Sequence, residues 1–166
     1  VPELAGVFNR ADIKYDIVSG YLADAEACKE IESWVDAAQV VHAMRNDRMG
    51  ILGHYYGGML DVYTNVTRLS FTFGTHMELF EMCELKDLRD VVSEEEIQAK
   101  VKEFNTTFDV VPECDEYEIR RAAQTSVSLD MLIEKHKLGS LAYYYEGSPG
   151  NEYENIVTSI IAGNTL

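Results

Sequence analysis

The chain has 166 residues, and its 29 Asp and Glu against 14 Lys and Arg give a formal net charge of −15 with neutral histidines. Its length and its hydrophobic content of 46% fit one globular domain of ordinary size and exclude intrinsic disorder. The acidic excess argues against a nucleic-acid partner and against an anionic membrane surface, because both bind Lys and Arg.

The sequence lacks the segments that direct a protein into or across a membrane. No window approaches the ~20 apolar residues that cross a bilayer, and the N-terminus has no secretory signal. The three cysteines, Cys28, Cys83 and Cys114, are widely spaced and form no C-x-x-C pair, which favours reduced thiols. We therefore expect a cytoplasmic protein without a membrane partner.

The first 47 residues predict two helices. One covers Glu3 to about Val18, and the other follows Asp24 as N-cap and runs to about Met44. The apolar residues of the second helix recur with the 3.6-residue helical period. We interpret residues 1–47 as a helical connector from a missing N-terminal domain and residues 48–166 as a central α/β domain.

Short apolar runs after residue 47 predict buried strands, and the segments between them predict helices. Strands are expected at Met49–Gly53, His76–Met82 and Ser140–Tyr145, and helices at Met59–Phe71, at Leu85–Val91 and from Tyr153 onward. Strands that alternate with helices indicate parallel α/β packing.

Two further helices have recognisable ends. Ser93 and Glu96 form a capping box, and the helix dipole explains the acidic run Glu94–Glu96 better than a cation site does. Asp115 is expected to begin a long helix, with Gly139 as its C-terminal cap.

These elements predict an α/β fold with a three-layer, Rossmann- or flavodoxin-like parallel sheet and helices on both faces. Three strands make a small sheet, the chain begins at Val1 without an initiator methionine, and Leu166 falls within the last predicted helix. We therefore expect a domain that is truncated at its C-terminal end and belongs to a longer chain.

Ligands of open parallel sheets bind beyond the carboxyl ends of the strands. Three turns are expected there, at His54–Gly58, Met82–Glu84 and Tyr145–Gly150. They bring most of the unusual side chains to one edge, namely His54, Tyr55, Tyr56, Tyr144, Tyr145 and Glu146.

The chemistry of this edge has alternative interpretations. The glycine turn 54–58 lacks the pattern and the lysine of a phosphate-binding loop. His54 and His76 have no second His or Cys at i+3 or i+4, which favours structural histidines over metal ligands. The tyrosines at 143–145 fit ordinary strand packing about as well as a pocket for a sugar or a ring.

Longer motifs resemble L-arabinose isomerase in its central region. GHYYGGMLDVYT at 53–64, FGTHME at 73–78, LAYYYEG at 141–147 and GNEYE at 150–154 follow one another in the expected order. The likeness runs over essentially the whole chain and is to the bacterial branch with GHYYGGMLD, rather than GDNMR, in its first turn. Asn65 departs from the aspartate more often found there.

The resemblance implies a segment of a longer, three-domain sugar isomerase that interconverts L-arabinose and L-ribulose through an enediol-type proton transfer. A divalent metal, usually Mn²⁺, assists this aldose–ketose isomerisation in the family, and two glutamates and two histidines hold it. All four ligands are expected after Leu166, so the segment supplies no metal ligand and no catalytic residue. The family forms homo-oligomers, commonly hexamers.

The sugar-pocket positions that the resemblance carries over fall on Tyr145 and Tyr56. His54, Tyr55 and Glu146 are secondary candidates for contacts with the small sugar. The segment alone is expected to be inactive. Two alternatives stay open, a stand-alone Rossmann- or flavodoxin-like binding module and a purely structural assembly domain.

Overall fold

The computed structural model describes residues 2–55, 57–144 and 149–160. Tyr56, Tyr145 and Glu146 therefore lie outside the described residues. The chain divides into two compact units, residues 1–43 and residues 44–166. The described helices include none that is long and apolar enough to span a membrane.

The first unit holds α1 (Pro2–Arg10) and most of α2 (Ala25–Asn46). The predicted end of the first helix at Val18 is wrong, because Asp12 adopts a left-handed conformation with φ of 54°. The N–H of Ile13 then donates to the carbonyl of Phe8, which closes the helix. The start of α2 is confirmed, since Asp24 Oδ1 accepts a hydrogen bond from the N–H of Glu26.

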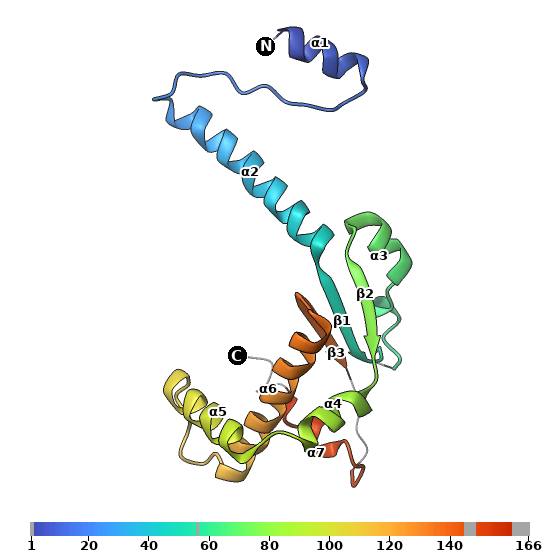
Figure 1. The fold of residues 1–166 in the computed structure, drawn as a ribbon, viewed down its shortest axis with the longest axis vertical. Helices are drawn as coiled ribbons and strands as arrows, with labels where there is room; N and C mark the ends of the chain where they lie inside the picture. Colours follow the sequence, from blue (N-terminus) through green and yellow to red (C-terminus); the bar gives the residue numbers. More distant parts are fainter. Residues whose placement is uncertain (1, 56, 145–148, 161–166) are drawn as a thin grey trace. The chain divides into compact units, whose positions relative to one another are not determined.

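The second unit contains a three-stranded parallel sheet in the order β2-β1-β3 (Figure 1). Its strands are β1 (Arg48–Gly53), β2 (His76–Phe80) and β3 (Ser140–Tyr144). Ile51 of the central strand pairs with Leu79 on one side and with Ala142 on the other. The predicted α/β class is thus confirmed as a small, open parallel sheet connected by helices.

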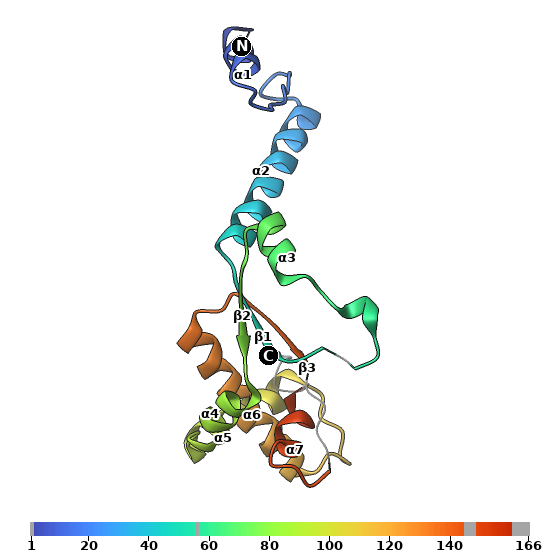
Figure 2. The same ribbon diagram turned by 90° about the vertical axis from the view of Figure 1, so that its right-hand side faces the viewer.

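The connection from β1 to β2 differs from the single helix predicted over Met59–Phe71. It consists of a 3₁₀ turn, η1 (Leu60–Val62), and a separate helix, α3 (Val66–Phe73) (Figure 2). The side chain of Asn65 accepts a hydrogen bond from the N–H of Arg68 at 2.9 Å. Asn65 therefore acts as an N-cap and starts a new helix instead of continuing an old one.

The connection from β2 to β3 contains α4 (Met82–Asp90), α5 (Glu94–Thr107) and α6 (Glu116–His136). Both predicted N-caps are confirmed: Ser93 and Glu96 form the capping box, and Asp115 accepts a hydrogen bond from the N–H of Tyr117. The helix predicted over Leu85–Val91 begins earlier, at Met82, and β2 correspondingly ends at Phe80. A short helix, α7 (Glu154–Val157), follows β3.

Gly139 is not the C-terminal cap of α6 as predicted. Lys137 takes the left-handed position, with φ of 55°, and the N–H of Leu138 donates to the carbonyl of Ile133 at 3.0 Å. Gly139 instead lies against Asp47, whose carboxylate occupies the space that a Cβ would need. Its N–H donates to the carbonyl of Arg48 and begins the β1–β3 ladder.

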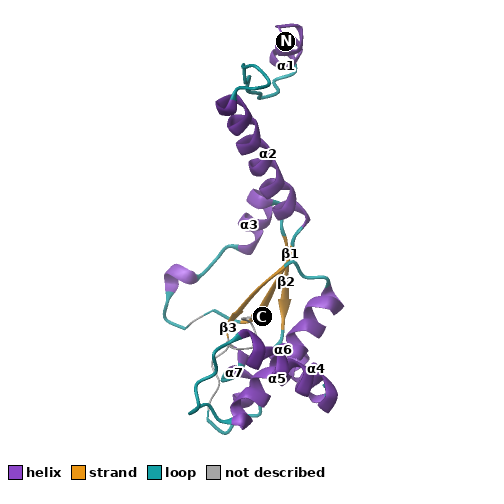
Figure 3. Cartoon of the chain, turned by 90° about the vertical axis from the view of Figure 1, so that its left-hand side faces the viewer, coloured by secondary structure: helices purple, strands orange, loops and turns teal. Residues whose placement is uncertain are grey.

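The main core lies between α6 and the face of the sheet that carries Leu52 and Phe80. Leu52, Leu129 and Leu132 are fully or almost fully buried there, and α4 and α7 add Leu85 and Ile156 to this core. A second cluster joins α5 to α6 through Ile97, Phe104, Ala122 and Ala123. Figure 3 shows η1 and α3 on the other side of the sheet from α4, α5 and α6.

A polar junction fastens the end of α6 to the sheet and to α4. Arg48 pairs with Glu78 and donates through Nε to the carbonyl of His136. Glu84 accepts a hydrogen bond from Lys135 at 2.7 Å, and its Oε1 lies 2.6 Å from His136 Nε2. Hydrogen bonding to Lys135 lowers the pKa of Glu84; His136 lowers it further, while burial opposes them.

Gly50 provides the first prediction. A Cβ at this position would lie 2.7 Å from Leu138 Cδ1 and 2.9 Å from Leu141 Cδ1. We expect Gly50→Val to lower the free energy of unfolding by about 1–3 kcal/mol through overpacking, measured by urea denaturation. Gly57→Ala is the control, because a Cβ at Gly57 meets nothing within 4 Å. Equal stability of Gly50→Val and wild type would contradict the close packing.

Glu84 provides a prediction of pH dependence. Because its pKa is lowered in the folded state from an ordinary value of 4.5, its charge stabilises the fold above pH 4.5, and this contribution is lost as the pH falls through the folded-state pKa. We expect Glu84→Gln to be less stable than wild type at neutral pH, with a difference that shrinks below pH 4.5.

Urea denaturation across this pH range measures the effect. Lys135→Met should reproduce much of it, because it removes the main cause of the lowered pKa. Lys102→Met, which removes an exposed lysine from α5, is the matched control. A constant difference between Glu84→Gln and wild type at every pH would show that the junction does not depend on the charge of Glu84.

Candidate functional site

His54 and Tyr144 meet where two neighbouring strands end. Gly53, the last residue of β1, pairs with Tyr144, the last residue of β3. The N–H of His54 donates to the carbonyl of Tyr144 at 2.9 Å, and the two rings contact edge-on with centroids 5.4 Å apart. β2 and β3 lie on opposite sides of β1, and ligands of open parallel sheets bind beyond the carboxyl ends of the strands.

The loop after β1 is folded back on itself by Tyr55. Its hydroxyl donates to the carbonyl of Thr64 at 3.1 Å, and its ring lies 5.3 Å from that of Tyr63. The Nδ1 of His54 lies 2.8 Å from the carbonyl oxygen of Tyr55. These contacts link the beginning of the loop to its end and hold η1 above the sheet.

A half-open cavity of about 370 Å³ lies between η1, α3 and the face of the sheet that carries Met49 and Ile51. Its floor consists of Met49 and Ile51 from β1, Met77 from β2 and Ala142 from β3. His54, Tyr55 and Tyr144 add polar groups to its lining. An apolar pocket with a few convergent polar groups is the usual form of a small-molecule site.

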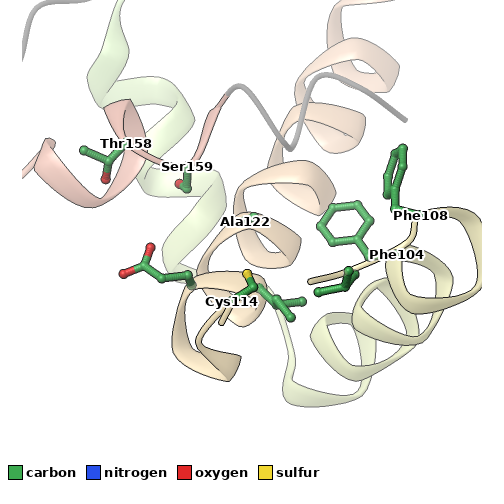
Figure 4. Close-up of a pocket in the computed structure, with 9 residues that line it drawn as sticks. Phe104, Phe108, Cys114, Ala122, Thr158 and Ser159 are labelled. Carbon is green, nitrogen blue, oxygen red and sulfur yellow. The ribbon is translucent and has the colours of Figure 1, made fainter. Parts of the chain in front are cut away.

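A second cavity of about 370 Å³ lies against α5 and α6 (Figure 4). Phe104, Phe108 and Ala122 line it together with Cys114, Thr158 and Ser159. It is likewise mostly apolar, but it lies against helices and not at the carboxyl ends of the strands. We therefore take the cavity beside His54 and Tyr144 as the candidate functional site.

The structure brings together only part of the predicted ligand edge. His54, Tyr55 and Tyr144 line one cavity, whereas Tyr56, Tyr145 and Glu146 lie outside the described residues. The predicted turn Met82–Glu84 is instead the first turn of α4. There Met82 is buried in the core, and Glu84 belongs to the polar junction.

Sequence reasoning missed the floor of the cavity. Met49 and Ile51 are two residues apart on β1, and such residues share a face of the sheet. This spacing could have predicted the part of the floor that β1 contributes. The contribution of Met77 and Ala142 depends on the pairing of β1 with β2 and β3, which the sequence did not reveal.

The titratable side chains do not assemble a metal centre within the part of the chain that the structure describes. There, no three His, Cys, Asp or Glu side chains form a group that could hold a metal ion. His76 lies at the start of β2, and its Nε2 is 4.0 Å from Glu78. Cys28, Cys83 and Cys114 are exposed, free thiols.

Compared with known protein families and with curated proteins, the chain matches none. The site is therefore defined by its own geometry: an apolar floor on the sheet, a covering loop tied by Tyr55, and a His–Tyr pair at the carboxyl ends of β1 and β3.

The cavity leads to a prediction about packing. Ala142 lines the cavity floor, so Ala142→Leu adds apolar atoms where space exists, and we expect it to stabilise the fold by about 1 kcal/mol. Ala123→Leu is the matched control, because Ala123 is fully buried in the α5–α6 core and should lose stability by overpacking. Thermal and urea unfolding measure both. A destabilised Ala142→Leu would show that the cavity cannot accept a side chain.

Proposed function

We propose that the chain is a segment of an L-arabinose isomerase and forms one wall of its sugar site. The observation that carries this proposal is the pairing of β1 with β3. It places the GHYYGGMLDVYT motif, which begins at Gly53, beside the LAYYYEG motif, which begins at Leu141. The two longest motifs of the resemblance thus meet at one edge of the sheet, beside a small-molecule cavity.

The strand order supports the more specific fold that we propose. The order β2-β1-β3 equals the first part of the 2-1-3-4-5 order of flavodoxin-like sheets, whose ligands bind between β1 and β3. Helices on both faces complete the proposed three-layer Rossmann- or flavodoxin-like domain. Further strands would extend the sheet beyond β3, whose outer edge is unpaired among the described residues.

The proposed role of this segment is to bind and orient the sugar. Tyr145 and Tyr56 would offer aromatic faces to the apolar side of a pentose. His54, Tyr55 and Glu146 would offer hydrogen-bonding groups to its hydroxyls. Tyr145 directly follows Tyr144 in the sequence, and Tyr144 lines the observed cavity.

The isomerisation moves a proton between C1 and C2 of the sugar, and the manganese ion implied by the resemblance would polarise the two oxygens during this transfer. The described residues offer no ligand set for such an ion. Because the resemblance places all four metal ligands after Leu166, we assign this segment no catalytic step. The proposed enzyme is a homo-oligomer, to which the exposed apolar residues of α2, such as Trp34 and Ile31, would contribute contact surface.

Sugar binding tests the proposal. We expect L-arabitol, which resembles the open-chain substrate, to change the tyrosine fluorescence of the 166-residue chain in a saturable way. Tyr145→Ala should weaken this binding at least about tenfold, which corresponds to about 1.4 kcal/mol. Tyr21→Ala, at a position 88% exposed in the first unit, should leave it unchanged.

The same preparation should show no manganese-dependent conversion of L-arabinose to L-ribulose, because the resemblance places all four metal ligands after Leu166. Saturable binding that survives Tyr145→Ala would contradict the assigned pocket. Measurable turnover would contradict the assignment of the metal site to other parts of the enzyme. Tight binding of a nucleotide in place of the sugar would favour the stand-alone binding module.

A further inference from the structure

Two arginines lie on one side of α6, away from the cavity beside His54 and Tyr144. Arg89 belongs to the last turn of α4, and its Nε donates to Thr125 Oγ1 at 3.1 Å. Arg121 lies one helical turn before Thr125, so both residues are on the same side of α6. The Nη1 of Arg121 donates to Asn155 Oδ1 at 3.3 Å.

The hydrogen bonding of this pair is incomplete. A guanidinium carries five N–H donors and no acceptor. Within the described ranges, Arg121 Nε is buried without an acceptor, and the Arg89 side chain bonds only to the neutral hydroxyl of Thr125. Buried donors without partners are rare and often indicate an ion or water that binds there.

The nearby carboxylates are already engaged. Glu118 lies 2.6 Å from Arg121 Nη2, and Asp90 pairs with Lys86 at 2.7 Å. Arg89 thus lacks an acidic partner among the described side chains, although acidic residues outnumber basic ones 29 to 14 in this chain. An arginine left without a carboxylate is unexpected in so acidic a protein.

The positive charges of the two arginines repel each other. Burial lowers the pKa of Arg89; the charge of Asp90 raises it, and that of Arg121 lowers it again. An anion between the two guanidinium groups would relieve this repulsion and accept the unused N–H donors. A second carboxylate would offer two oxygens in one plane, whereas a tetrahedral oxyanion offers oxygens in several directions to donors from two helices.

We propose that Arg89 and Arg121 form a binding site for a phosphate dianion or the phosphoryl group of a small phosphomonoester. The anion bridges the two guanidinium groups and replaces the long hydrogen bond from Arg121 to Asn155, which opens access to the buried Nε. Thr125 keeps Arg89 in place beside it. The site is separate from the sugar pocket, and it does not rest on the proposed isomerase function.

The test is a titration of the 166-residue chain with inorganic phosphate at constant ionic strength. The ionic strength is held constant because added salt alone weakens the interactions between surface charges. The arginine Nε–H signals in ¹⁵N-resolved NMR spectra provide the readout. We expect saturable shifts of the Arg89 and Arg121 signals. Glycerol 3-phosphate forms the second arm: tighter binding than phosphate identifies a phosphomonoester as the ligand, and weaker binding identifies the free ion.

Variants decide whether the pair is the site. Arg89→Gln and Arg121→Gln should each weaken phosphate binding at least about tenfold, as expected for loss of charge-assisted hydrogen bonds. Arg120→Gln is the matched control, because Arg120 is the neighbour of Arg121 but pairs with Glu94 at 2.6 Å. Arg89→Lys retains the positive charge but lacks the planar guanidinium, so it should bind phosphate with intermediate affinity. This variant still tests the site if a glutamine variant fails to fold.

The proposal is overturned if phosphate produces no saturable shift at Arg89 or Arg121. It is equally overturned if Arg120→Gln weakens binding as much as Arg89→Gln, because the effect would then reflect general charge. Sugar binding by the same samples remains a separate measurement, so failure of one site is distinguishable from failure of the other.

Discussion

The close approach of the chain to Gly50 is the constraint on which the second unit depends. Gly50 lies in the middle of the central strand, and the side chains of Leu138, Leu141 and Phe80 converge on the space above its Cα. Leu138 comes directly after the turn that ends α6, and Leu141 belongs to β3. One missing side chain thus allows the end of a long helix and the start of the next strand to pack on β1. The pairing of β3 with β1, and with it the contact between His54 and Tyr144, follows from that packing.

Polar groups determine where this packing can occur along the strand. Asp47, the residue directly before β1, joins this strand to the start of β3. It accepts a hydrogen bond from Ser140 and fills the space beside Gly139. Arg48 reaches the last carbonyl of α6 at His136. A shift of β3 by one residue would break these contacts and would move its apolar residues to the other face. The junction at the amino ends of the strands therefore determines which residues meet at their carboxyl ends.

Local sequence patterns were sufficient to predict the helix ends that depend on residues close together in the chain. Ser93 and Asp115 were correctly predicted as N-caps, because a capping side chain bonds to backbone two or three residues away. The ends at Asp12 and Lys137 were missed, since an aspartate and a lysine occupy left-handed positions that glycine usually takes. Likewise, Asn65 starts a helix within a segment whose apolar pattern looked continuous. The cavity floor was out of reach, because it is formed by three strands whose register depends on contacts far apart in the sequence.

The two faces of the sheet are packed unequally, and this difference has a physical basis. On one face, α6 buries Leu52 and Phe80 in a continuous core with Leu129 and Leu132. On the other face, the elements that cover the strands within the described part of the chain are the short η1 and α3, and the Tyr55–Thr64 hydrogen bond holds the covering loop. A cavity on the second face costs little stability, because the first face already supplies the main core. His54 and Tyr144 line the cavity on this second face, so a ligand bound beside them would leave the main core on the first face in place.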